Sequence, residues 1–374
     1  MNITESILNN EEKALLSLRG LYENYGYSQF KMAKFEEYDL YVRNKDFLLS
    51  NNIITFTDTN GKLMALKPDV TLSIIKNLKE ESDCIQKVYY SENVYRVSKD
   101  TKTYKQLMQT GLECIGNLDL YNICEVILLA SKSLANISSN YILALSHIGI
   151  ISIILEGLSL TADQEKIIFK YIGEKNIHGI ENLCKQTDSD EELCENLITL
   201  ISMYGSMDTV LEKLKNISLN AKMSNFISEL ESICEILKLN GFGNTQIDFS
   251  IINGMNYYNE IVFQGFIDGI PSAVLSGGRY DKLMQKMGKH SGAIGFAVYV
   301  DLLEYLDCSQ KSFDVDILLI YDADTDVKAL TQSVKELNST GQSVQVQKSV
   351  SRALKYKKLL QLKDGRLEIL ESND

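Results

Sequence analysis

Apolar residues near the start of the chain recur every three to four positions, which is the period of an α-helix. Within residues 11–25, Ala14, Leu18 and Tyr22 fall on one side of such a helix. Gly26 follows, and glycine readily adopts the left-handed conformation that ends many helices. The first element is therefore predicted to be an amphipathic helix.

A strand-like pattern replaces the helical one between about residues 85 and 115. The runs CIQKVYYSENVYRV and KQLMQTGLECIG flank the polar stretch SKDTKTY, an arrangement that is typical of an antiparallel hairpin with a long loop. From about residue 153 to 240 the helical period returns, with Leu230, Ile233 and Leu237 on one face and Gly241 after them. This stretch is predicted to be a helical insertion.

Strand-like runs resume after the insertion, so that helices divide a β-rich core in the sequence. TQIDFSII, NEIVFQGF and SAVLSGG alternate with turns at NGMN and DGIP, and RYDKLMQKM and FAVYVDLLEYL are predicted helices. After Ser312, strand-like DVDILLIY, helical DVKALTQSVKEL, QSVQVQ and the basic, helix-like SRALKYKKLL follow the order of a small α/β unit. We place a boundary between a domain of residues 1–310 and one of residues 311–374.

Composition narrows the range of partners. The chain has 374 residues, 45% of them apolar, a formal charge of -12 and a pI near 5.0. Nucleic-acid affinity depends on Lys and Arg that displace counterions, so this charge argues against a nucleic-acid partner. The beginning of the chain lacks a basic region followed by an apolar run, and no long unbroken apolar stretch follows. We therefore expect a cytoplasmic protein without membrane contact.

The cysteines and histidines predict no metal site. Seven cysteines occur at irregular spacings without a CxxC pair, and the three histidines show no ligand-like spacing. An odd and irregular set gives no disulfide framework. We expect the cysteines to be reduced packing residues.

Two neighbouring strand-like runs carry polar residues that could form a binding site. Arg96 presents a planar fork of donors suited to a carboxylate or phosphate, although an ordinary surface arginine at a strand end is the alternative. Gln109, Gly111 and Glu113 share one face of the next strand because side chains alternate along a strand. That face could hold a ligand or could be a solvent-facing strand edge.

Four segments resemble the core of class II histidyl-tRNA synthetases in their order and approximate spacing. They are LKPDVT at 66–71, VYRVSKDTKTYKQLMQTGLECIG at 94–116, NGMNYYNEIVFQGF at 253–266, and LSGGRYDKLMQKMG at 275–288 followed by GAIGFA at 292–297. The resemblance spans most of residues 1–305 and implies an α+β fold, in which an antiparallel sheet is flanked by helices, usually in a dimer. The C-terminal unit resembles an anticodon-binding domain cut short.

The resemblance also implies a histidine-binding pocket. In the family, the arginine matching Arg96 meets the carboxylate of the amino acid, and a glutamate that binds its amino group is here the shorter Asp69. The pair Tyr257-Tyr258 matches the family's histidine-specificity motif. The predicted histidine-binding residues are Asp69, Thr71, Arg96, Gln109, Glu113, Tyr257, Tyr258, Gly277 and Gly278.

The chain departs from the synthetases where they activate the amino acid. Asn253 and Leu302 stand where the family has arginines of its adenylation site, and Ala33 replaces a proline of its first motif. Neither an amide nor an alkyl group supplies the positive charge that stabilises the transition state of this reaction. We therefore predict no catalytic residue and no cofactor.

A synthetase-like chain without these arginines and with a shortened C-terminal unit is similar to the regulatory subunits of ATP phosphoribosyltransferase. The similarity implies a non-catalytic protein that activates a short-form catalytic subunit in the first step of histidine biosynthesis. It further implies histidine as a regulatory ligand and a homodimer within a hetero-oligomer. The alternatives are a divergent active histidyl-tRNA synthetase, which needs arginines at positions 253 and 302, and a sensor of uncharged tRNA, which needs a complete, basic C-terminal domain.

Overall fold

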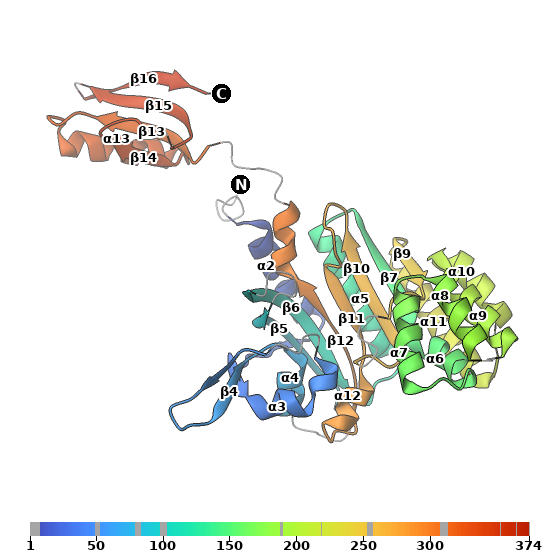
Figure 1. The fold of residues 1–374 in the computed structure, drawn as a ribbon. Helices are drawn as coiled ribbons and strands as arrows, with labels where there is room; N and C mark the ends of the chain where they lie inside the picture. Colours follow the sequence, from blue (N-terminus) through green and yellow to red (C-terminus); the bar gives the residue numbers. More distant parts are fainter. Residues whose placement is uncertain are drawn as a thin grey trace. The chain divides into compact units, whose positions relative to one another are not determined.

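The computed structural model describes residues 8–48, 53–78, 84–97, 103–187, 190–217, 219–252, 257–306, 313–351, 353–363 and 365–373. The chain forms two compact units, Met1–Leu306 and Asp307–Asp374. Figure 1 shows the elements of both units. The larger unit contains the segments that resemble a synthetase core, and the candidate site lies in it.

A nine-stranded sheet forms the centre of the larger unit, in the order β1-β5-β6-β12-β11-β10-β7-β9-β8. The six strands from β5 to β7 in this order are antiparallel, and the predicted hairpin is confirmed as its β5 and β6 pair. Towards the edges, β1 pairs with β5 and β9 with β7 in parallel, which the sequence pattern did not indicate. The strand bounds are β1 Ser28–Gln29, β5 Gln86–Val97, β6 Tyr104–Gly116, β7 Tyr141–His147, β8 Tyr204–Ser206, β9 Thr245–Asp248, β10 Ile261–Ile267, β11 Leu275–Arg279 and β12 Gly292–Tyr299.

Two helices cover one face of this sheet. The predicted first helix is confirmed as α2 (Asn10–Asn24), which buries the expected apolar side and is followed by Gly26 at φ 81°. It packs on α5 (Leu120–Ile137), where the hydroxyls of Tyr22 and Ser133 lie 3.0 Å apart. By length and composition α5 could cross a membrane, but 61% of it is buried inside the fold. A helix packed between a sheet and other helices is apolar on most sides for that reason.

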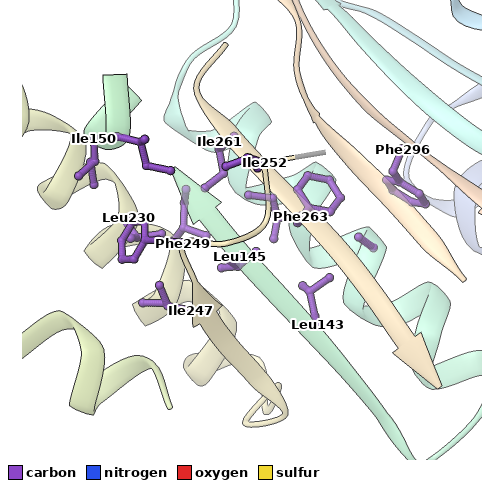
Figure 2. Packing of buried hydrophobic residues seen from close by; sticks show 14 of the residues in the cluster. Leu143, Leu145, Ile150, Leu230, Ile247, Phe249, Ile252, Ile261, Phe263 and Phe296 are labelled. Carbon is purple, nitrogen blue, oxygen red and sulfur yellow. The ribbon is translucent and has the colours of Figure 1, made fainter. Parts of the chain in front are cut away.

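The predicted insertion is a bundle of helices at one edge of the sheet (Figure 1). Its core is continuous with that of the sheet, because Ile150 and Leu230 from the bundle cluster with Ile247 and Phe249 from the segment of β9 (Figure 2). The first helix of the bundle follows β7 directly, a few residues earlier than the sequence pattern indicated. The elements are α6 Ile148–Gly157, α7 Ala162–Gly173, α8 Ile177–Gln186, α9 Glu191–Ser202, α10 Met207–Leu214, η2 Lys215–Ile217 and α11 Ala221–Leu239.

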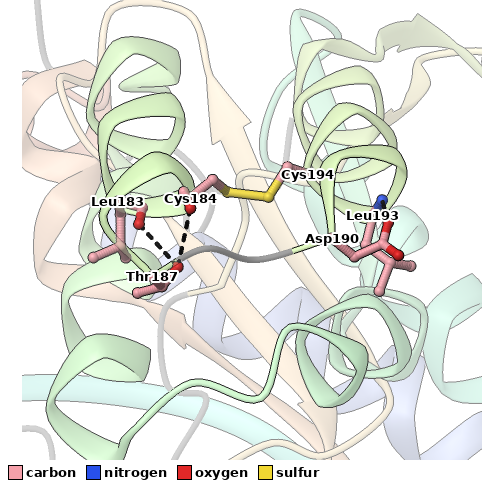
Figure 3. The surroundings of a disulfide bond; sticks show 6 residues. All are labelled: Leu183, Cys184, Thr187, Asp190, Leu193 and Cys194. Atoms are coloured by element: carbon pink, nitrogen blue, oxygen red, sulfur yellow. Dashed lines mark hydrogen bonds between the residues drawn. A yellow bond between two sulfur atoms is a disulfide. The ribbon is translucent and has the colours of Figure 1, made fainter.

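The expectation of reduced cysteines is wrong for one pair within this bundle. Cys184 on α8 and Cys194 on α9 form a disulfide, with Cα atoms 6.4 Å apart (Figure 3). The two cysteines are ten residues apart in the sequence. They meet only because two helices pack side by side, a relationship that no local spacing motif encodes. Cys308 lies outside the described residues.

A small three-stranded sheet, in the order β2-β4-β3, lies beside helix α4. This helix follows Lys67-Pro68-Asp69, which we call the KPD segment. Ala65 of the central strand and the apolar residues of that helix form a second core with Tyr90 of β5. This core fixes the KPD segment against the large sheet. The elements are β2 Phe35–Glu37, α3 Tyr38–Arg43, η1 Lys45–Phe47, β3 Thr55–Thr57, β4 Leu63–Leu66 and α4 Thr71–Asn77.

Of the two helices predicted near residues 279–306, the first is confirmed as α12 (Asp281–Lys286) and the second is half wrong. The run FAVY belongs to β12, and only the 3-10 helix η3 (Val300–Leu306) follows it. Phe296 and Val298 are both buried, which is the period of a strand. The five apolar residues in a row masked that alternation.

The smaller unit is a four-stranded sheet, in the order β14-β13-β15-β16, packed on one helix. The basic segment SRALKYKKLL was predicted to be helical, and this is wrong because its second half, Tyr356–Leu360, belongs to strand β15. Leu360 and Leu362 of that strand alternate into the core beneath Leu330 of the helix. The elements are β13 Val315–Tyr321, α13 Val327–Ser339, β14 Val344–Gln347, β15 Tyr356–Lys363 and β16 Arg366–Ser372.

Candidate functional site

A cavity of about 360 Å³ lies on the sheet face opposite α2 and α5. On β6, Leu112 and Cys114 belong to the core beneath these helices, so Glu113 between them points to the other face. Strands β5, β6, β10, β11 and β12 supply the floor, and the KPD segment and Tyr257-Tyr258 supply the walls. The face that the sequence left open as a ligand site or a solvent-facing edge is a lined cavity.

Seven of the nine predicted histidine-binding residues line this cavity: Asp69, Thr71, Arg96, Gln109, Glu113, Tyr257 and Tyr258. The other two, Gly277 and Gly278, do not line it. A Cβ at Gly278 would lie 2.7 Å from the ring of Tyr258, and one at Gly277 would lie 2.6 Å from the ring of Phe263. The glycines therefore let aromatic rings pack closely on β11 and act behind the cavity wall.

Glu113 lies at the bottom of the cavity and is held at both carboxylate oxygens. The Thr71 hydroxyl donates to Oε1 at 2.8 Å, and the Tyr280 hydroxyl donates to Oε2 at 2.6 Å. Burial raises the pKa of Glu113 to about 8, although both hydroxyls oppose that shift. A carboxyl group that changes protonation near neutral pH can accept a proton from an imidazole ring or donate one to it.

Asp69 and Arg96 form the charged rim of the cavity. Oδ1 of Asp69 accepts a hydrogen bond from the Leu72 amide at 3.0 Å, and burial raises the pKa of this carboxyl group. Nε of Arg96 donates to the Pro68 carbonyl at 2.9 Å. Among the described residues that line the cavity, Arg96 is the only lysine or arginine. The rim thus offers one fixed cation and one carboxyl group.

Aromatic rings enclose the space between this rim and Glu113. The centroids of Tyr257 and Tyr258 are 4.9 Å apart, and those of Tyr257 and Tyr280 are 5.5 Å apart. Burial raises the pKa of all three phenols well above the ordinary value, so their hydroxyls stay neutral donors. A flat ring with polar nitrogens is the kind of ligand group that suits such a cage.

Several lining residues were missed by the sequence analysis: Tyr90, Gln264, Ser276, Tyr280 and Tyr299. Gln264 gave one usable signal, because it is a lone polar residue within the apolar strand run IVFQGF. Tyr280 ends the GGRY run and was not assigned a role. Tyr90 and Tyr299 gave no signal, since a tyrosine at a strand position is more often a core residue than a ligand contact.

Asn253 and Leu302 are the two positions where the family has arginines of its adenylation site. Asn253 lies outside the described residues. Leu302 on η3 packs against the main core and does not line the cavity. Arg279 forms ion pairs with Glu260 at 2.6 Å and with Asp281 at 2.8 Å, and it does not line the cavity.

In the part of the chain that the structure describes, no group of three or more His, Cys, Asp or Glu side chains could hold a metal ion.

Known proteins resemble the chain over most of its length. The histidyl-tRNA synthetase family matches residues 3–303. An ATP phosphoribosyltransferase regulatory subunit from Oceanobacillus iheyensis is 28% identical over 290 residues, which are 76% of this chain and 71% of that protein. A solved ATP phosphoribosyltransferase regulatory subunit/histidyl-tRNA synthetase from Bacillus halodurans has a TM-score of 0.76 at 21% identity and covers 94% of this chain and 93% of its own.

A second solved structure is an ATP phosphoribosyl transferase (HisG:HisZ) complex from Thermotoga maritima. One of its chains has a TM-score of 0.61 at 19% identity and covers 76% of this chain and 96% of its own. These likenesses confirm the predicted fold class, a class II synthetase-like sheet flanked by helices.

Proposed function

The chain belongs to the histidyl-tRNA synthetase family, and from this premise we propose that it is a non-catalytic regulatory subunit of ATP phosphoribosyltransferase that binds histidine. Its catalytic partner is a short-form subunit that performs the first step of histidine biosynthesis in the cytoplasm. The chain is a homodimer within the hetero-oligomer, and residues 1–310 and 311–374 are its two domains. Histidine that binds to this chain inhibits the catalytic partner through the contact between the two subunits.

One observation supports this proposal above the others: among the described residues, the cavity lining combines the carboxyl groups of Asp69 and Glu113 with a single cation, Arg96. Activation of a carboxylate by ATP gathers negative charge that preorganised cations must stabilise. Losing one such donor raises the barrier by ~3–4 kcal/mol, or a hundred- to thousandfold in rate. With only Arg96 among the described lining residues, the cavity suits binding better than adenylation.

The lining residues fit histidine group by group. Arg96 can pair with the carboxylate, Asp69 with the amino group, and Glu113 with the ring, between Tyr257 and Tyr258. Each pairing joins opposite charges or a donor with an acceptor. The cavity volume of about 360 Å³ leaves room for histidine and several waters.

The names of the relatives support the regulatory role. The relative from Oceanobacillus iheyensis is named a regulatory subunit, and the Thermotoga maritima structure is a complex of two different subunits. A stable complex of this kind needs a large complementary surface on the regulatory chain. We propose that this surface lies outside the cavity, and activation and histidine inhibition can then be tested separately.

The test uses the purified full-length chain, alone and with a short-form catalytic subunit. Alone, the chain should support no histidine-dependent exchange of pyrophosphate into ATP, and calorimetry should detect histidine binding. With the partner, it should restore synthesis of phosphoribosyl-ATP, and added histidine should suppress that synthesis. Robust pyrophosphate exchange would overturn the proposal in favour of an active synthetase, and a partner that is equally active alone would overturn the regulatory role.

A further inference from the structure

Lys67 is a charged residue that does not line the cavity and yet is completely buried. Its Nζ lies 3.0 Å from Oε2 of Glu92, and the exposed fractions of the two side chains are 0% and 19%. Burial lowers the pKa of Lys67, and Glu92 opposes this shift. Removing an ammonium group from water is costly, so an ion pair at this depth adds little stability and calls for another explanation.

The pair joins two segments that carry the charged rim of the cavity. Lys67 and Pro68 belong to the KPD segment, and Glu92 belongs to β5, four residues before Arg96. Three contacts fasten the segment to this strand. The Tyr95 amide donates to the Lys67 carbonyl at 2.8 Å, Nε of Arg96 donates to the Pro68 carbonyl at 2.9 Å, and the Lys67 ammonium donates to Glu92.

These contacts bear on the distance between Asp69 and Arg96. Asp69 directly follows Pro68, and its carboxyl group is held by the Leu72 amide at 3.0 Å. Nε of Arg96 is bound to the Pro68 carbonyl, and the Arg96 side chain lines the cavity. The amino and carboxylate groups of an amino acid sit on the same carbon atom. Their two partners must therefore keep a fixed spacing, and a displacement of an ångström is costly.

We propose that the ion pair of Lys67 and Glu92 is a positioning clamp, which sets the spacing of Asp69 and Arg96 for recognition of the amino-acid end of the ligand. This inference rests on the proposed histidine binding and adds residues that do not touch the ligand. Lys67 and Glu92 are positioning residues, and their effect passes through Arg96. The clamp explains why the KPD segment buries a lysine where an apolar residue would pack more readily.

The test separates positioning from stability by replacing both partners with apolar residues. In the double variant Lys67→Met, Glu92→Leu no charge is left unpaired, so thermal unfolding should stay close to that of the wild type. Calorimetry should nevertheless show histidine affinity at least about tenfold weaker, the size of effect expected when a charged hydrogen bond is lost. Lys62→Met is the matched control, because Lys62 forms an exposed ion pair with Glu37 at 2.9 Å and should leave affinity unchanged.

A second comparison shows whether the clamp acts through Arg96. Arg96→Ala should weaken histidine binding strongly in the wild type and only slightly in the double variant, because contacts within one network are not additive. Unchanged affinity in a folded double variant, or a full additional loss on Arg96→Ala, would overturn the clamp. If the double variant does not fold, Glu92→Gln keeps the volume and removes the charge, and it should weaken binding severalfold; unchanged affinity overturns the inference there. Absence of histidine binding by the wild type would instead refute the proposed function, and the clamp with it.

Discussion

Glu113 on β6 lies directly opposite Gly295 on β12, and its carboxylate occupies the space that a side chain at position 295 would need. A Cβ built at Gly295 collides with Oε2 of Glu113 and with the Leu112 carbonyl. The second glycine of GAIGFA therefore makes room for the group at the bottom of the cavity. Its φ is ordinary, so the requirement for glycine comes from space and not from backbone conformation.

Gly295→Ala should displace Glu113 and weaken histidine binding at least about tenfold, because the hydroxyls of Thr71 and Tyr280 hold the carboxylate in one place. Overpacking of this kind should also lower the free energy of unfolding by about 1–3 kcal/mol. Urea denaturation and calorimetry measure the two effects. Gly20→Ala is the control, since Gly20 is exposed on α2 with nothing within 4 Å of a Cβ, and it should stabilise the protein by up to about 1 kcal/mol.

The raised pKa of Glu113 makes a prediction about stability and pH. The folded-state pKa of about 8 lies above the ordinary value of 4.5, so the protonated form stabilises the folded protein at low pH. That contribution is lost as pH rises from about 4.5 through 8. Relative to the Glu113→Gln variant, the free energy of unfolding of the wild type should therefore fall by up to about 4 kcal/mol between pH 5 and pH 9. Urea unfolding at a series of pH values measures this change. A difference in unfolding free energy between the two proteins that stays constant from pH 5 to pH 9 would contradict the prediction.

Arg96→Ala should separate inhibition from activation. The reconstituted complex should still make phosphoribosyl-ATP, but its histidine inhibition curve should shift at least about tenfold towards higher concentration, because a charged hydrogen bond of ~1.5–3 kcal/mol is lost. Arg43→Ala, at an exposed ion pair with Asp39, should leave the curve in place. An unchanged midpoint in a folded, assembled complex would place the regulatory histidine elsewhere.

Reduction of the bond between Cys184 and Cys194 should destabilise the helical bundle. For a loop of about ten residues, the loss of the cross-link corresponds to about 2–3 kcal/mol. Urea unfolding with and without a reductant measures the difference. A Cys184→Ser variant should be insensitive to the reductant, and a wild type that is equally insensitive would show that the bond contributes nothing in solution.

The sequence by itself determined the elements that have a regular period and the residues that belong to extended motifs. Ala14, Leu18 and Tyr22 identify α2, and the alternation of polar residues along β6 assigns Gln109 and Glu113 to one face. Motif resemblance added Tyr257 and Tyr258. Helical and strand periods are local, and a motif keeps its order along the chain, so the sequence is sufficient to assign these residues to α2 and to the part of the chain that lines the cavity.

Only the tertiary structure decided which distant residues meet. Tyr90, Tyr280 and Tyr299 reach the cavity because four antiparallel strands align them, and each looks like a core residue in its own segment. An apolar run concealed the strand period of Phe296–Tyr299, and the adjacent lysines Lys357 and Lys358 interrupted that of β15. The contact of Gly295 with Glu113, the disulfide between two helices and the ion pair of Lys67 with Glu92 all join segments that are separate in the sequence. Their energies depend on packing and burial, which a linear pattern does not contain.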